Sequence, residues 1–211
     1  MKNFTQVNHP ILQYKLSVLR KKETNPISFR ALMNELGKFL AYEYAKDFET
    51  ETYPIETPLT TTDGIRPKHY PIVVSILRAG NGMIDGGLET VPHSPAGHIG
   101  IYRDKFINNT VEYYFKLPEN AKGRDVLLID PMLATGDTAV AAIDRLKQYE
   151  VGKITMMSLI VSAQGIEKLH HFHPDVDIIC LSKEEALNEK GYLIPGIGDV
   201  GDRLYNTGKD N

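Results

Sequence analysis

The sequence predicts an α/β fold in which helices flank a doubly wound, largely parallel sheet. Short apolar runs of strand length alternate with segments of helix length through most of the chain. The runs are predominantly apolar, and residues 126–129 are apolar at every position, which is typical of strands buried on both faces of a parallel sheet. The 211 residues, 42% of them hydrophobic, suffice for one substantial core. We therefore expect a single domain over residues 1–211.

Two helices are predicted ahead of the first strand. Leu12, Leu16 and Leu19 recur at helical spacing, and a longer apolar stripe follows Pro26 at intervals of three and four residues. The members of that stripe are Phe29, Leu32, Met33, Leu36, Phe39 and Leu40. We expect both helices to cover one face of the sheet. A Thr/Pro-rich connection around residues 57–67 then leads to the first strand.

Five apolar runs predict the strands. They are residues 72–77, 98–102, 126–129, 154–161 and 176–181, with helices expected at 138–149 and 164–171. Residues 107–116 hold Asn108 and Asn109 before an alternating apolar pattern, which indicates a hairpin or flap. In doubly wound folds ligands gather at the carboxyl ends of the strands.

Composition limits the classes of partner and compartment. Lys and Arg number 24 and Asp and Glu 27, for a net charge of -3, so we expect neither a nucleic-acid nor a membrane partner. The single cysteine, Cys180, excludes an intramolecular disulfide and suits a reducing cytosol. The first residues lack an apolar signal core, and no stretch approaches the roughly 20 apolar residues that span a bilayer. We expect a cytoplasmic protein.

The segment from Asp130 to Thr138 has the composition of a phosphate cradle. It runs from an apolar strand through a loop into a predicted helix. Ala134 and Gly136 let the backbone approach a ligand, and the helix start offers amides and a positive dipole end. Thr135 and Thr138 add hydroxyl donors, and the Asp130 carboxylate can accept hydrogen bonds from sugar hydroxyls. This combination predicts a phosphorylated-sugar site; the alternative is ordinary turn and helix-cap residues.

Two arginines end or follow other predicted strands. Arg78 follows residues 72–77, and Arg103 follows residues 98–102. Their guanidinium groups would reach the same edge of the sheet as the 130–138 loop, where they suit phosphate or diphosphate oxygens. Each arginine taken alone is more often a solvated surface charge, but both share a predicted edge with the 130–138 loop.

A glycine-rich segment occupies residues 191–202. Gly196, Gly198 and Gly201 match G-x-G-x-x-G, but a dinucleotide fingerprint needs an acidic residue about 20 positions later. Only ten residues follow Gly201, so we reject that interpretation. We expect main-chain groups here to bind a flat ligand, with Asp199 supplying charge near the reacting centre. A solvated C-terminal turn is the alternative.

Other motifs in the sequence give weaker indications of function. The absence of G-x-x-x-x-G-K-[ST] argues against a P-loop enzyme. His170, His171 and His173 lack the spacing of metal ligands, and we expect structural roles for them. Cys180 lies in an apolar run and is predicted to be a small core residue.

Taken together, these segments resemble the uracil phosphoribosyltransferases of the type I phosphoribosyltransferase superfamily. The resemblance covers nearly the whole chain. Its most specific part is Asp-Pro-Met-Leu-Ala-Thr-Gly at 130–136, because most of the superfamily has a second acidic residue in place of Pro131. Further matching stretches are residues 8–20, 76–80, 102–104, 113–114 and 191–203. The implied fold is a phosphoribosyltransferase-type doubly wound sheet with a β-hairpin flap and a C-terminal base-binding loop.

The resemblance implies a role for individual residues. The substrate 5-phosphoribosyl 1-diphosphate (PRPP) would be bound by Arg78, Arg103, Asp130, Pro131, Met132, Leu133, Ala134, Thr135, Gly136, Asp137, Thr138 and Asp199. Uracil would lie against Tyr192, Leu193, Gly198, Asp199 and Val200. Asp130, Asp199 and Arg103 would be the catalytic residues.

The resemblance also implies the reaction. Phosphoribose passes from PRPP to N1 of uracil, giving UMP and diphosphate, through a transition state with cationic character at the ribose carbon. The protein then acts by positioning and electrostatics. Mg²⁺ would arrive with PRPP rather than in a cage of protein ligands. The resemblance implies a homo-oligomer, at least a dimer, and leaves open its size and whether GTP binds as an activator.

Two single positions and one short stretch depart from the family's usual residues. Asp137 stands where glycine is more frequent, which puts a carboxylate beside the expected 5'-phosphate. If the Asp137 side chain turns outward as a helix cap, the backbone cradle is retained. Val200 replaces a common alanine, and residues 105–107 replace an acidic run.

Two other functions remain compatible with this fold. One is a regulator that senses nucleotides and binds RNA, although such a protein needs a basic face and the net charge is -3. The other is a phosphoribosyltransferase for a different base.

Overall fold

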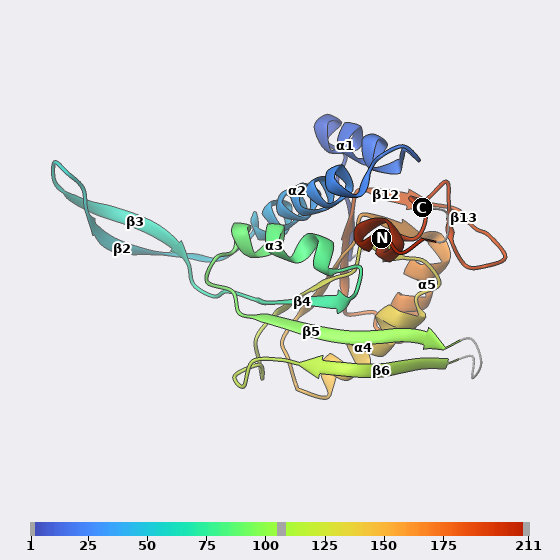
Figure 1. Ribbon diagram of the computed structural model, residues 1–211. Coiled ribbons are helices and arrows are strands. Elements are labelled where there is room, and N and C mark those ends of the chain that lie inside the picture. The colour runs from blue at the N-terminus through green and yellow to red at the C-terminus, as the bar shows by residue number, and fades with distance from the viewer. Residues whose placement is uncertain (1–2, 105–108, 209–211) are drawn as a thin grey trace.

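A seven-stranded sheet forms the centre of the protein, for which the computed structural model describes residues 3–104 and 109–208 (Figure 1). In spatial order the strands are β1 (Phe4–Gln6), β11 (Asp177–Cys180), β9 (Ile154–Met157), β7 (Val126–Ile129), β4 (Ile72–Leu77), β5 (Ala96–Asp104) and β6 (Asn109–Lys116). Neighbours pair in parallel except β5 and β6, which are antiparallel. The predicted doubly wound, largely parallel sheet is confirmed.

Helices cover both faces of the sheet. α1 (Pro10–Arg20), α2 (Pro26–Ala45) and α3 (Asn81–Thr90) pack on one face through a core that includes Leu16, Phe29 and Met83. α4 (Asp137–Lys147) and α5 (Ala163–Phe172) pack on the other face through a second core that includes Ile143 and Leu169. Figure 1 shows α1, α2 and α3 together on one side of β4 and β5. The prediction that the two N-terminal helices share a face is confirmed.

The starts of α1 and α2 follow from the sequence. Pro10 and Pro26 are the first residues of the two helices, where the fixed φ of proline suits the helix and no amide is lost. The His9 side chain accepts the first amide of α1, and Asn25 Oδ1 accepts the Ser28 N–H at 2.9 Å. Both helices therefore begin where a cap residue precedes proline.

The predicted strands are confirmed, except that one predicted strand forms two separate strands in the structure. Residues 72–77 and 126–129 match β4 and β7 at both ends, and β5 extends beyond 98–102. The run 154–161 divides into β9 and β10 (Ile160–Ser162). β10 pairs instead with β8 (Met132–Leu133) and β12 (Ser182–Glu184) in a second sheet. Both pieces are buried, so the apolar run carries no sign of the break.

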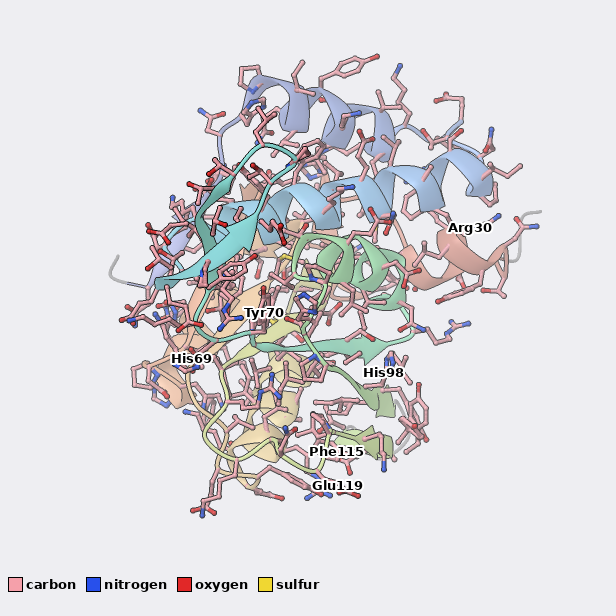
Figure 2. All side chains as sticks on the ribbon, turned by 90° about the vertical axis from the view of Figure 1, so that its left-hand side faces the viewer. Arg30, His69, Tyr70, His98, Phe115 and Glu119 are labelled. Atoms are coloured by element: carbon pink, nitrogen blue, oxygen red, sulfur yellow. The ribbon has the colours of Figure 1, made fainter. Side chains whose placement is uncertain are left out.

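The connection predicted at 57–67 is wrong, because most of these residues belong to a long antiparallel hairpin. Its strands β2 (Thr50–Glu56) and β3 (Thr61–Pro67) pair along their full length and project away from the sheet (Figure 1). Most hairpin side chains are exposed, so no apolar run marks the strands. Figure 2 looks from the side of this hairpin, with His69 and Tyr70 in the segment that joins it to β4.

The C-terminal segment is anchored rather than loose. β13 (Ala186–Leu187) and β14 (Leu193–Ile194) form a short antiparallel pair, and α6 (Val200–Tyr205) follows. Arg30 of α2 donates a hydrogen bond to the Leu204 carbonyl at 2.7 Å and thereby ties α6 to the body (Figure 2). The flap predicted at 107–116 is the β5–β6 pair from Asn109 onward, while residues 105–108 lie outside the described residues.

Candidate functional site

Three neighbouring strands end at one edge of the sheet, and each leads into a predicted site residue. Ser75 of β4 pairs with Ile129 of β7, so Arg78 and Asp130, which follow these strands, lie at the same edge. On the other side of β4, Leu77 pairs with Gly100 of β5, and Arg103 lies near the end of β5. The side chain of Arg103 is outside the described residues. We call this edge, defined by residues 77–78, 100–103 and 129–138, the active rim.

Asp130 lies where β7 meets the loop, and it is partly buried. Its main chain is fixed, because Ser158 Oγ donates to the Asp130 carbonyl at 2.6 Å. Desolvation raises the pKa of the Asp130 carboxyl to about 7, against the opposing effect of the Met132 N–H at 3.5 Å from Oδ1. Near neutral pH this group therefore changes between a hydrogen-bond donor and a pure acceptor.

The loop 134–138 leads directly into α4. Gly136 is the N-cap of α4, and its φ of 86° lies in the left-handed region that favours glycine. The first helical hydrogen bond runs from the Val140 N–H to the Gly136 carbonyl at 2.9 Å. Gly136 has no side chain, so the N-cap residue makes no side-chain hydrogen bond to the first amides of α4. The first amide groups of such a helix have no acceptor within it and, with the positive end of the dipole, suit an anion.

The Asp137 side chain contacts two neighbouring side chains. Thr135 Oγ1 donates a hydrogen bond to Asp137 Oδ2 at 2.8 Å, and Lys168 Nζ pairs with Asp137 Oδ1. Both carboxylate oxygens are therefore engaged, one by the loop and one by α5. The Thr135 hydroxyl, expected as a phosphate donor, is directed to Asp137 in this structure.

The glycine-rich segment reaches the active rim at two points. A Cβ on Gly191 would lie 3.4 Å from Cγ2 of Thr135. A Cβ on Gly201 would lie 3.3 Å from Nη2 of Arg78 and 3.4 Å from Oδ1 of Asp199. The fold thus brings together the ends of β4 and β7 and a segment more than 50 residues further along the chain.

Asp199 joins two parts of that segment. Its Oδ1 accepts the Asp202 N–H at 2.9 Å as the cap of α6, and its Oδ2 accepts a hydrogen bond from the Tyr192 hydroxyl at 3.3 Å. Partial burial and the Asp199 charge raise the pKa of Tyr192, so this phenol stays a donor at neutral pH. Leu193 and Val200 are buried, and Gly198 has a φ of 74°.

Charged residues that the sequence patterns did not indicate hold the segment in place. Arg20 at the end of α1 forms an ion pair with Glu184, which is only 5% exposed. Arg20 Nη1 donates to the Gly196 carbonyl at 2.8 Å, and Glu184 Oε2 accepts the Gly196 N–H at 3.0 Å. Arg203 Nη1 donates to the Leu19 carbonyl at 2.8 Å. The partners lie far apart in sequence, so no spacing could have predicted them.

Histidines and the cysteine have structural surroundings. His170 Nε2 lies 3.1 Å from the Val176 carbonyl, and His173 Nε2 lies 3.3 Å from Asp144 Oδ1. Cys180 is buried in β11, as predicted, and burial raises the pKa of its thiol to about 12. Within residues 3–104 and 109–208, no group of three or more acidic, histidine or cysteine side chains is arranged to hold a metal ion, and no helix is long and apolar enough to cross a membrane.

The sequence matches a protein-family model across almost its full length. The model described as uracil phosphoribosyltransferase matches residues 6–207. A uracil phosphoribosyltransferase of Legionella pneumophila is 50% identical over 202 residues, which cover 95% of this chain and 94% of the relative. One from Brucella anthropi is 47% identical over 204 residues, covering 96% and 98%.

Solved structures agree at two levels of similarity. The AQ2163 protein from Aquifex aeolicus superposes with a TM-score of 0.91 at 33% identity, covering 98% of this chain and 99% of that one. An adenine phosphoribosyltransferase from Trypanosoma brucei gives a TM-score of 0.59 at 13% identity over 94% of this chain and 89% of that one. The second likeness concerns the fold alone, which is that of the type I phosphoribosyltransferases.

Proposed function

The chain belongs to the uracil phosphoribosyltransferase family, and we propose that its active site is the active rim together with residues 191–202. The protein is thus a pentosyltransferase. We propose PRPP and uracil as substrates and UMP and diphosphate as products. The observation that carries the site assignment is the meeting of Arg78 and Thr135 with the glycine-rich segment, which contains Asp199.

PRPP is proposed to bind along the active rim. Its 5'-phosphate would occupy the start of α4, where Gly136 lets the backbone turn and Thr138 supplies a hydroxyl. The Asp130 carboxylate would accept hydrogen bonds from the ribose hydroxyls. Arg78 and Arg103 would bind the diphosphate, because they are cations at the ends of β4, which neighbours β7, and of β5, which neighbours β4. The proposed contacts also include Pro131, Met132, Leu133, Ala134 and Asp137.

Uracil is proposed to lie against residues 192–200. Main-chain N–H and C=O groups from Leu193 to Val200 can match the alternating carbonyl and N–H edge of uracil, whereas cytosine would leave some unpaired. The Tyr192 hydroxyl, already bonded to Asp199, stiffens this wall. This placement also puts the Asp199 carboxylate beside the ribose carbon that becomes cationic as diphosphate leaves. The charge of Asp199 would stabilise that state.

Magnesium is proposed to enter as the Mg–PRPP complex. Mg²⁺ prefers oxygen ligands and keeps several waters, and the diphosphate of PRPP supplies such oxygens. The carboxylates of Asp130 and Asp199 fit this arrangement, because they can accept hydrogen bonds from metal-bound water. When bound, the ion would neutralise charge on the leaving diphosphate.

The hairpin supports our proposal of a homo-oligomer. β2 and β3 project from the sheet, and Leu59 at the tip is 96% exposed while Ile65 is 70% exposed (Figure 1). At the foot of the hairpin lies an open cleft of about 880 Å³, lined in part by Tyr44, Tyr70 and His93. Because the cleft lies at the amino ends of β4 and β7, opposite the active rim, we assign it to contact with a second copy rather than to catalysis.

We also propose that the chain forms a single domain and that the protein is cytoplasmic. A single domain is supported by the two cores, which pack on opposite faces of one sheet. A cytoplasmic location is supported by Cys180, a buried free thiol that suits a reducing compartment.

UMP formation tests the proposed function. Labelled uracil and Mg–PRPP should give UMP with the wild-type protein, and Asp130→Asn should lower kcat/KM for PRPP about a hundredfold. Cytosine, orotate and hypoxanthine should compete poorly with uracil. Full activity in a folded Asp130→Asn protein would refute the proposed ribose site, and efficient use of another base would refute the proposed acceptor.

A further inference from the structure

Helix α5 presses closely on the loop proposed to bind the 5'-phosphate. Gly165 permits this contact, since a Cβ there would lie 2.5 Å from the Ala134 carbonyl oxygen and 2.8 Å from that of Leu133. Ser162, the cap of α5, donates from Oγ to the same Ala134 carbonyl at 2.5 Å. The first turn of α5 and the loop 133–136 therefore form one packed unit.

Lys168 projects from α5 onto this loop. It follows Gly165 by three residues and so lies on the same face of the helix. Its stem packs along Gly136, because a Cβ on Gly136 would lie 3.3 Å from Lys168 Cβ and 3.4 Å from Cδ. Its ammonium group pairs with Asp137. This cation therefore reaches the turn that begins α4.

Asp137 has opposing effects at this position. A carboxylate in the first turn of α4 is favoured by the helix dipole when the site is empty. A bound 5'-phosphate would compete for the same positive end, and its negative charge would repel Asp137. The structure contains two means of reducing this conflict, since Thr135 holds Oδ2 and Lys168 holds Oδ1.

We propose that Lys168 is the counter-ion that makes Asp137 compatible with a bound 5'-phosphate, and that it thereby sets the affinity for PRPP. The proposal rests on the proposed position of the 5'-phosphate at the start of α4. Lys168 is a positioning residue, because it acts through Asp137 and through Thr135, which Asp137 orients. The pair itself is partly exposed, with side-chain exposures of 37% for Lys168 and 28% for Asp137, so it contributes little to stability.

Four variants and a control test the proposal by steady-state kinetics. Lys168→Met should raise KM for PRPP roughly tenfold, the size expected of one uncompensated charge near the phosphate, with kcat and KM for uracil within about twofold. Lys168→Arg should keep KM for PRPP close to the wild-type value. Asp137→Asn should lower KM for PRPP, because it removes a negative charge beside the proposed 5'-phosphate. The double variant Asp137→Asn/Lys168→Met should return KM for PRPP to within about threefold of wild type.

Lys147 provides the matched control. It pairs with Asp175 at the far end of α4, and its side chain is also 37% exposed. Lys147→Met should leave KM for PRPP unchanged. The Lys168→Met effect should also shrink as ionic strength rises, because the interaction is partly exposed.

The outcomes separate this inference from the site assignment. Thr138→Val removes a proposed phosphate donor without touching the ion pair. If Thr138→Val raises KM for PRPP and Lys168→Met does not, the counter-ion role is refuted while the site stands. If neither raises it, the proposed phosphate position is refuted as well. If Asp137→Asn does not suppress the Lys168→Met effect, Lys168 does not act through Asp137, and the proposal is overturned.

Discussion

Asp130 shows how one residue combines a functional requirement with a cost in stability. Its place at the end of a buried strand removes water from the carboxyl group, and this desolvation raises the pKa to about 7. A protonated carboxyl is a weaker acceptor for ribose hydroxyls than a carboxylate. Affinity for PRPP should therefore depend on pH in the neutral range.

The pH dependence of kcat/KM for PRPP checks this expectation. In the wild type it should fall as pH decreases through about 7, because Asp130 takes up a proton in the free enzyme. Asp130→Asn should lack this step. Ionisation of the 5'-phosphate of PRPP affects both proteins equally, so the difference between the two profiles reports Asp130. Parallel profiles would contradict the assignment.

Stability should show the opposite trend. The folded-state pKa of about 7 exceeds the ordinary 3.8, so between these values the folded state binds a proton that the unfolded state does not. The free energy of unfolding should therefore decrease as pH rises from about 4 to 7, because the folded protein must release this extra proton. Asp130→Asn should be more stable than wild type at pH 8, by about 1–3 kcal/mol after allowance for partial exposure. Urea denaturation at pH 5 and pH 8 measures the difference in unfolding free energy between Asp130→Asn and the wild type. The same difference at both pH values would contradict the raised pKa of Asp130.

At the scale of elements, α1 and β12 fix the position of the loop around Gly196, which belongs to neither of them. Arg20 ends α1, Glu184 ends β12, and together they bind both main-chain groups of Gly196. A loop whose main chain must match the edge of a base needs a fixed shape, and this ion pair supplies it. The chain thus positions its proposed uracil segment with one residue near each end of the chain.

Glu184→Gln tests the role of this pair. The change leaves the Arg20 charge poorly compensated and should destabilise the fold by about 1–3 kcal/mol. KM for uracil should rise several-fold more than KM for PRPP, because Gly196 loses its charged partner. The neighbouring Glu185 offers a matched control, since it pairs with Lys183 at the surface and is 75% exposed. Equal effects on the two substrates would argue against a specific role in the base loop.

For the whole molecule, the projecting hairpin is the feature that an isolated chain does not explain. A two-stranded hairpin with exposed side chains is marginally stable alone, and edge strands are prone to association. A second copy that packs against it would bury Leu59 and Ile65.

Shortening the hairpin tests this directly. Replacement of residues 55–62 by a two-residue turn should shift the protein toward monomer in analytical ultracentrifugation at micromolar concentration. The sheet core should be retained, as judged by circular dichroism, because the hairpin lies outside both cores. If the shortened protein forms an oligomer of the same size as the wild type, the hairpin does not belong to the interface. Leu59→Glu is a milder variant that should act in the same direction.

Local patterns in the sequence determined most of the fold. Apolar runs located β4 and β7 at both ends, and apolar residues at helical spacing located α1 and α2, because burial patterns repeat over a few residues. The proposed phosphate loop can be recognised for the same reason, because its residues 130–138 are contiguous. The hairpin was missed because its strands gain little from burial.

Only the tertiary structure decided which distant groups meet. It brought Lys168 to Asp137, Arg20 and Glu184 to Gly196, and Gly201 to Arg78, across separations that no periodicity records. It also decided the raised pKa of Asp130, because desolvation depends on all the chain segments that surround a group. Secondary-structure preferences depend on neighbouring residues, whereas charge pairing and solvent exclusion depend on the packing of the whole chain.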